Sequence, residues 1–123
     1  MSGEIVNLML TLRNQVKIYH WETMKYARHK ATDDLVDKLD DAIDKFVEVY
    51  IGKYGRPKLT PRTGTIRLRN FDDTQATTLL TEAISWMTDR LPSLLSKNDT
   101  DLLNIRDEII ADLNQTRYLF TFN

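Results

Sequence analysis

Cysteine is absent from this sequence of 123 residues, and glycine, proline and histidine number only four, three and two. The absence of cysteine excludes disulfides, thiolate metal sites and a cysteine nucleophile. No apolar run approaches the roughly 18 residues of a membrane-spanning helix, and the first twelve residues lack the features of a signal peptide. A Gly-rich phosphate loop, a serine nucleophile with a histidine partner and zinc-ligand spacing are also missing. We therefore expect a soluble, cytoplasmic protein that is neither a hydrolase nor a nucleotide-dependent enzyme.

The composition is that of one ordinary globular domain. Hydrophobic residues make up 41% of the chain and charged residues 28%, which suits a folded protein with a single core. We expect that domain to span residues 1–123, because the length fits one domain and nothing suggests repeats or a second unit. The formal net charge of −1 gives no general attraction to nucleic acids or membranes, so we expect neither as a partner.

The first two helices are predicted from apolar residues at helical spacing. The first should run to about Lys25 or Tyr26, and the second should begin near Ala31, with Thr32 or Asp33 as its cap. We expect the inward faces of these helices to be Ile5, Leu8, Met9, Leu12, Val16, Tyr19 and Thr23 on the first, and Leu35, Leu39, Ala42, Ile43, Phe46 and Tyr50 on the second.

Two further helices are predicted in the second half of the chain. Asp72 or Asp73 should cap the third, Pro92 should kink or restart it, and Asn98 or Asp99 should cap the fourth. Their inward faces are Ala76, Leu79, Leu80, Ala83, Met87, Leu91 and Leu94, then Leu102, Ile105, Ile109, Leu113, Thr116 and Phe120. Four helices in two antiparallel pairs, joined by one long connection, predict an all-α, ferritin-like four-helix bundle.

The long connection between the second and third helices, residues 55–72, is the most basic part of the chain. Its cations are Arg56, Lys58, Arg62, Arg67 and Arg69. Alternation over Thr65 to Phe71 predicts a short extended segment with Ile66 and Leu68 facing inward. The cations could bind phosphate groups, but Phe71 is the only aromatic residue nearby for base stacking. We therefore expect them to pair with acidic helix faces.

The second helix carries an acidic stripe beside its apolar face. The stripe, at about 100° per residue, consists of His29, Asp33, Asp37, Asp40, Asp44 and Glu48. Like charges at this spacing repel one another, so a cation should compensate them. Carboxylates with an imidazole suit iron, manganese or magnesium. A solvated acidic face neutralised by salt or by a neighbour is the alternative interpretation.

A second, weaker apolar stripe lies on the first helix at Val6, Leu10, Trp21 and Met24. One helix packed against a single layer does not need this second stripe. A subunit contact through the first two helices is one explanation, and it predicts self-association as a homodimer or a larger cage.

Several motifs resemble the Dps group of mini-ferritins. They are the run Tyr19, His20, Trp21; then His29, with Asp33, Asp44 and Glu48 following it; Gly55, Arg56, Pro57; and the segment NDTDLLNI at 98–105. The match covers much of the chain in the expected order. Two features differ from that family, since His20 and His29 are nine residues apart and no glycine follows His20 and Trp21.

The resemblance implies a ferroxidase that oxidises ferrous iron, with manganese as another metal that would fit. The implied ligands are His20, His29 and Asp33 of one subunit, and Asp44 and Glu48 of its two-fold mate. Trp21 would lie near the metal and transfer electrons. The alternative is a non-catalytic bundle that serves as a structural or interaction module, for example in a virion.

Overall fold

The computed structural model describes residues 2–123, and within that range it contains helices and no strand. The helices are α1 (Ser2–Glu22), α2 (Tyr26–Tyr54), α3 (Asp73–Ser85) and α4 (Thr100–Leu119). A π-helical turn, η1 (Trp86–Arg90), and a 3-10 turn, η2 (Leu91–Leu94), continue α3. The all-α prediction is therefore confirmed.

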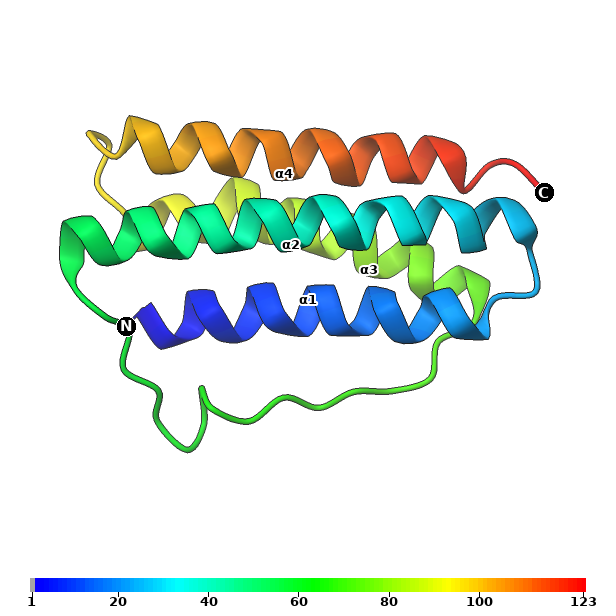
Figure 1. The fold of residues 1–123 in the computed structure, drawn as a ribbon, viewed down its shortest axis with the longest axis horizontal. Helices are drawn as coiled ribbons and strands as arrows, with labels where there is room; N and C mark the ends of the chain where they lie inside the picture. Colours follow the sequence, from blue (N-terminus) through cyan, green and yellow to red (C-terminus); the bar gives the residue numbers. More distant parts are fainter. Residues whose placement is uncertain (1) are drawn as a thin grey trace.

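The four helices lie side by side in an elongated bundle (Figure 1). Helices α1 and α4 run in one direction, and α2 and α3 run in the other. Helix α1 packs against α2 and α3, and α4 packs against the same two helices. Each helix therefore has antiparallel neighbours. The connection between α2 and α3 runs along α1 for most of its length.

The core contains the apolar faces that the sequence predicts. Of the twenty-six positions named for the four faces, all but Leu8, Thr23, Ala42, Leu79 and Leu94 are buried, and these five are half-buried. The burial follows from the helical spacing, because residues three and four apart share one face of a helix.

The predicted boundary between the first two helices was wrong. Helix α1 ends at Glu22 and α2 begins at Tyr26, five residues before the expected start at Ala31. The turn between them is short because Lys25 is extended and its amide donates to the Thr23 hydroxyl at 3.1 Å. Thr32 is not a cap, since its hydroxyl donates to the Arg28 carbonyl inside the helix at 2.7 Å.

The starts of α3 and α4 differ in their chemistry. Asp72 caps α3 as predicted, in a capping box with Gln75 that satisfies two backbone amides. Pro92 falls in the 3-10 turn after the π-helical turn, so the regular α-helix ends before the proline that was predicted to kink or restart it. Asp99 precedes α4, but its side chain forms no capping bond to that helix.

Polar side chains of α1 hold the backbone of the connection. The Asn7 amide donates to the Thr63 and Thr65 carbonyls, each at 2.8 Å. Gln15 binds both the amide and the carbonyl of Arg69, and Glu22 accepts from the Phe71 amide at 3.1 Å. These bonds replace those that a neighbouring strand would make.

Two expectations for the connection were wrong: that Leu68 faces inward, and that the cations pair with acidic helix faces. No strand forms at 65–71, and Leu68 is exposed while Ile66 is half-buried. None of the ion pairs found among residues 2–123 includes a cation of the connection, so these cations do not pair with the acidic helix faces of their own chain. The side chains of α1 bind its backbone instead, and all five cations are exposed.

Candidate functional site

His20 and His29 lie face to face where α1 and α2 meet. Their ring centres are 4.0 Å apart, and the ring planes differ by only 15°. His20 comes from the last turn of α1 and His29 from the first turns of α2, so the short turn at 23–25 brings them together. His20 is buried and His29 is half-buried.

Each histidine is bonded to the backbone of the other. His20 Nδ1 lies 2.8 Å from the His29 carbonyl, and His29 Nδ1 lies 2.9 Å from the His20 carbonyl. A carbonyl only accepts, so each Nδ1 must carry its proton. In the neutral form of each ring the lone pair is therefore on Nε2, and within residues 2–123 neither Nε2 forms a hydrogen bond. Metal-binding histidines commonly have this arrangement, with one nitrogen bonded to the protein and the other free.

Thr32 helps to fix the orientation of the His20 ring. Its hydroxyl donates to the Arg28 carbonyl, so its oxygen is left to accept from His20 Nδ1, 3.1 Å away. Thr32 is completely buried. Sequence reasoning treated Thr32 only as a helix cap and missed this contact, because the contact depends on where α2 begins.

Aromatic residues surround the histidine pair. The Trp21 ring lies 6.5 Å from His20, and the Tyr26 ring lies 6.4 Å from His29. Trp21 is 67% exposed, and the ammonium group of Lys17 lies 5.3 Å from the centre of its ring. The indole is therefore near the histidines, but it is open to solvent.

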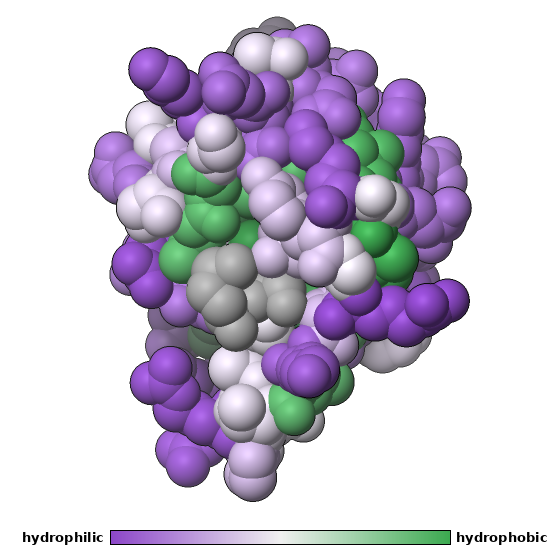
Figure 2. Space-filling model, turned by 90° about the vertical axis from the view of Figure 1, so that its left-hand side faces the viewer, coloured by the Kyte–Doolittle hydropathy of each residue, from purple (hydrophilic) through white to green (hydrophobic). Residues whose placement is uncertain are grey.

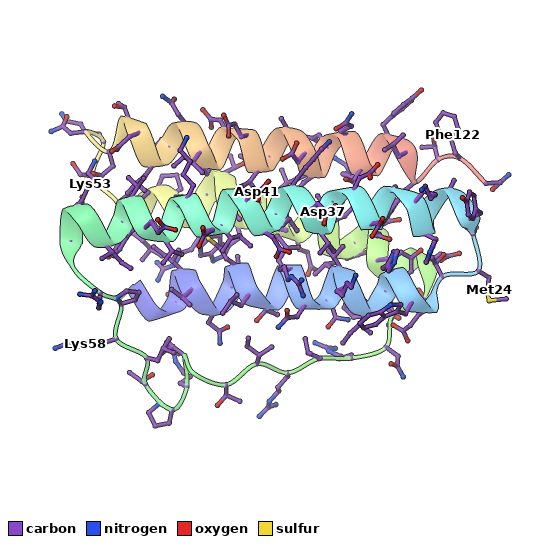
Figure 3. The ribbon with its side chains drawn as sticks, in the orientation of Figure 1. Met24, Asp37, Asp41, Lys53, Lys58 and Phe122 are labelled. Atoms are coloured by element: carbon purple, nitrogen blue, oxygen red, sulfur yellow. The ribbon has the colours of Figure 1, made fainter. Side chains whose placement is uncertain are left out.

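The five carboxylates of the acidic stripe on α2 are all exposed. Asp33, Asp37, Asp40, Asp44 and Glu48 all have exposed side chains. The stripe follows the edge of α2 next to α1, since Arg13 of α1 binds Asp40 at 2.8 Å. Figure 3 labels two exposed aspartates of α2, Asp37 of this stripe and Asp41 outside it.

Asp44 and Glu48 form a pair of neighbouring carboxyl groups. Hydrogen bonding to Asp44, together with the repulsion of its charge, raises the pKa of Glu48 above its usual value. Neighbouring carboxylates repel each other when both are ionised, and a cation bound between them would relieve this repulsion. The pair is thus a suitable half-site for a cation.

One chain does not bring all the predicted ligands together. Among residues 2–123, no three histidine or carboxylate side chains lie close enough to hold a metal ion. The histidine pair is preformed, Asp33 is one turn beyond His29, and the Asp44 and Glu48 pair lies further along α2. A metal site built from the predicted residues would therefore need ligands from a second molecule.

The described chain contains no helix that combines the length and the apolar character needed to cross a membrane.

Two comparisons relate the chain to known sequences. A protein of Enterobacteria phage T4, "Uncharacterized 14.6 kDa protein in mobD-ri intergenic region", is 30% identical over 120 residues, covering 98% of this chain and 88% of the phage protein. No solved structure matches. Residues 20–120 match the family described as "Family of unknown function (DUF5856)". That match includes His20 and all of α2, α3 and α4, and the chain belongs to this family.

Proposed function

We propose that this protein is a ferritin-like bundle that binds and oxidises ferrous iron between two subunits. Each site would combine His20, His29 and Asp33 of one chain with the partner's Asp44 and the partner's Glu48. The antiparallel neighbours and the long connection between α2 and α3 support the ferritin-like assignment. A two-fold axis would create two identical sites in each dimer.

The histidine pair is the observation that carries this proposal. Backbone carbonyls hold both imidazoles in the tautomer that leaves Nε2 unprotonated, and the rings are stacked at 4.0 Å. Neither Nε2 is among the buried unpartnered atoms of the described chain, so both reach the surface, where a metal ion could bind them. Neutral imidazole and carboxylate oxygen together suit ferrous or manganous ions.

Exposed apolar residues of α1 support the association of two chains. Leu10 is 40% exposed and Trp21 67% exposed, both on the side of α1 next to the acidic stripe. A second copy docked on this face would cover them. It would also bring the partner's carboxylates toward the histidine pair.

In this reaction iron is the substrate. Two ferrous ions lose one electron each, and dioxygen or hydrogen peroxide accepts two electrons together with two protons. The role of the protein is to hold the ions in place and to supply carboxylates, which bind ferric iron more tightly than ferrous iron. Trp21 would be a nearby source or acceptor of one electron.

Anaerobic titration with ferrous iron tests the proposal. The wild-type protein should bind iron and melt at a higher temperature, because a ligand that binds only the native state stabilises it. His29→Ala, Asp33→Asn and the double variant Asp44→Asn/Glu48→Gln should each lose binding. Asp41→Asn, on the solvent side of α2, is the matched control and should keep it. A wild-type protein that binds no iron would refute the proposal.

The double variant also tests how the carboxylates act without metal. Because Asp44 raises the pKa of Glu48, the ionised pair destabilises the apo fold at neutral pH. Asp44→Asn/Glu48→Gln should therefore leave the metal-free protein equally stable or slightly more stable. A loss of apo stability would assign these residues to a structural contact.

A structural or interaction module is the second candidate. The lack of a three-ligand group within one chain favours it, since such a protein does not need a complete site. In this case the protein would self-associate through α1 and α2 without binding metal. A dimer whose mass and melting temperature do not respond to ferrous or manganous ions would support this candidate.

A further inference from the structure

Arg28, in the first turns of α2, is a buried cation without a counter-ion. The residue is only 8% exposed, and no ion pair among residues 2–123 includes it. Its Nη1 donates to the Tyr19 hydroxyl at 3.0 Å and to the Asp73 carbonyl at 2.8 Å. Its guanidinium carbon lies 4.4 Å from the centre of the Phe120 ring.

The unsatisfied atom of Arg28 is Nε, which is buried and has no partner in the described chain. Burying a donor without a partner destabilises a fold, and burying a charge without a counter-charge destabilises it further. The Phe120 ring compensates only part of the charge. The guanidinium therefore has no directly bound anion in the described chain.

The nearest carboxylate already has other partners. Asp73 accepts hydrogen bonds from the hydroxyls of Tyr19 and Thr23, and its second oxygen lies 3.7 Å from Lys25. The bond from Tyr19 is the main reason that the pKa of Asp73 lies below its usual value, and Arg28 adds to the effect from a longer distance. Asp73 therefore stays ionised, but it does not bind the guanidinium.

An open depression lies beside this group, with a volume of about 340 Å³. Its lining residues are Lys25, Arg28, Asp73, Thr74, Thr77 and Thr78. Two cations against one carboxylate give this lining a net charge of +1. The depression adjoins the first turns of α3, where the amides of Asp73 and Thr74 have no partner within the helix and the helix dipole favours an anion.

We propose that this depression binds a phosphate-type oxyanion, either inorganic phosphate or the phosphate of a monoester. Arg28 and Lys25 would supply the charge. The side chains of Thr74 and Thr78, which are exposed and form no hydrogen bond in the described chain, would donate to the remaining oxygens. Phosphate suits the site because Nη2 of Arg28 has no hydrogen-bond partner in the described chain and, unlike Nε, is not among its buried unpartnered atoms, so it can donate to a phosphate oxygen. This site is separate from the proposed metal site.

Thermal unfolding at constant ionic strength tests the proposal, with chloride as the reference anion. The melting temperature should rise with the logarithm of phosphate concentration, up to about 20 mM, and should not respond to chloride. Methyl phosphate gives the second arm, since a monoester site should respond to it at lower concentration than to inorganic phosphate. The same titrations by calorimetry should show one anion per chain.

Thr78→Glu provides an anion within the chain. Its carboxylate would occupy the depression, so the phosphate-dependent rise in melting temperature should disappear. Thr81→Glu adds the same charge further along α3, outside the lining, and should keep the rise. Arg28→Lys keeps the charge but removes Nη2, the proposed donor to the phosphate, and should weaken phosphate binding.

Two results would overturn the proposal. One is a wild-type melting temperature that phosphate and methyl phosphate do not raise. The other is equal phosphate responses from Thr78→Glu and Thr81→Glu. Both exchanges are at exposed positions, so the comparison stands even if Arg28→Lys does not fold.

Discussion

At the scale of single residues, Asp99 links the end of α2 to the start of α4. Its carboxylate accepts from the Lys53 ammonium group at 2.8 Å, from the Tyr54 hydroxyl and from the Ser96 amide, also at 2.8 Å. The side chain is almost completely buried. Figure 2 shows the end of the molecule at which α2 ends and α4 begins, where hydrophilic side chains surround smaller hydrophobic patches. These hydrogen bonds lower the pKa of Asp99 to about 2, and the bond from Lys53 has the largest effect.

We predict that Asp99→Asn lowers the free energy of unfolding by about 2 kcal/mol at pH 7, because a buried, charged hydrogen-bond acceptor is lost. Chemical denaturation measures this. Asp101→Asn is the matched control, since Asp101 binds the same ammonium group but is exposed, and it should lower the free energy of unfolding far less than Asp99→Asn does.

The difference in unfolding free energy between the wild type and Asp99→Asn should shrink at low pH. The pKa of Asp99 is about 2 in the folded protein and close to 3.8 when unfolded. A carboxyl group whose pKa is lower in the folded state stabilises the fold at pH values above its unfolded pKa. The wild type should therefore keep its full stability advantage over Asp99→Asn above about pH 4. The advantage should shrink as the pH falls toward 2. A difference that is constant from pH 7 to pH 2 would contradict the role of the charge.

Two helical glycines should respond oppositely to replacement by alanine. A Cβ on Gly3 would lie 2.7 Å from the Thr63 hydroxyl and 2.8 Å from the Lys58 carbonyl, whereas one on Gly52 would meet nothing within 4 Å. We predict that Gly3→Ala destabilises the protein by about 1–2 kcal/mol through overpacking. Gly52→Ala should stabilise it by about 0.5–1 kcal/mol through helix propensity. Equal melting shifts would contradict the close approach of the connection to α1.

Residue-level contacts were the least predictable part of the candidate site. The residue types His20, His29, Asp33, Asp44 and Glu48 can be picked out by spacing and family resemblance. The stacking of the two rings and their reciprocal backbone bonds cannot be predicted in this way. They depend on the exact start of α2, and sequence patterns locate a helix boundary only to within a few residues. The role of Thr32 was missed for the same reason.

At the scale of elements, the connection between α2 and α3 depends on α1 for its position. It contains no strand, and Gln15 supplies the two bonds that a neighbouring strand would give to Arg69. Lys58, near its start, extends away from the bundle (Figure 3).

We predict that Gln15→Ala frees the second half of the connection. Trypsin should then cleave after Arg67 and Arg69 several times faster, since local opening controls cleavage there. Asn14→Ala, at the neighbouring position, makes no bond to the connection and should leave cleavage unchanged. If Gln15→Ala is cleaved at the wild-type rate, the hydrogen bonds from Gln15 do not keep this segment ordered.

The order and inward faces of the helices followed from the sequence, because apolar residues at a spacing of three or four leave few alternatives. The start of α2 could not be predicted from the sequence. Residues 26–31 carry three basic side chains and no glycine or proline, so the pattern shows no start signal there. The helix begins at Tyr26 because the extended Lys25 and the Thr23 hydroxyl form the turn before it.

At the scale of the whole molecule, the apolar residues exposed on α1 predict an interface. We expect Leu10→Glu to convert a self-associated protein into monomers of 14.4 kDa, because it places a charge in the proposed contact. Leu59→Glu, at an exposed position of the connection, is the control and should not change the mass. Light scattering gives the mass. A wild type that is already monomeric at micromolar concentration would argue against the interface.

Mixing two inactive variants tests the intersubunit site most directly. His29→Ala lacks one half of each proposed site, and Asp44→Ala/Glu48→Ala lacks the other. When they are unfolded together and refolded, half of the dimers should be mixed, and each mixed dimer should contain one intact site of two. We predict about a quarter of the wild-type iron-binding capacity, whereas each variant alone should bind none. A mixture that binds no more iron than the separate variants, while wild-type protein treated in the same way binds it, would contradict a site shared between subunits.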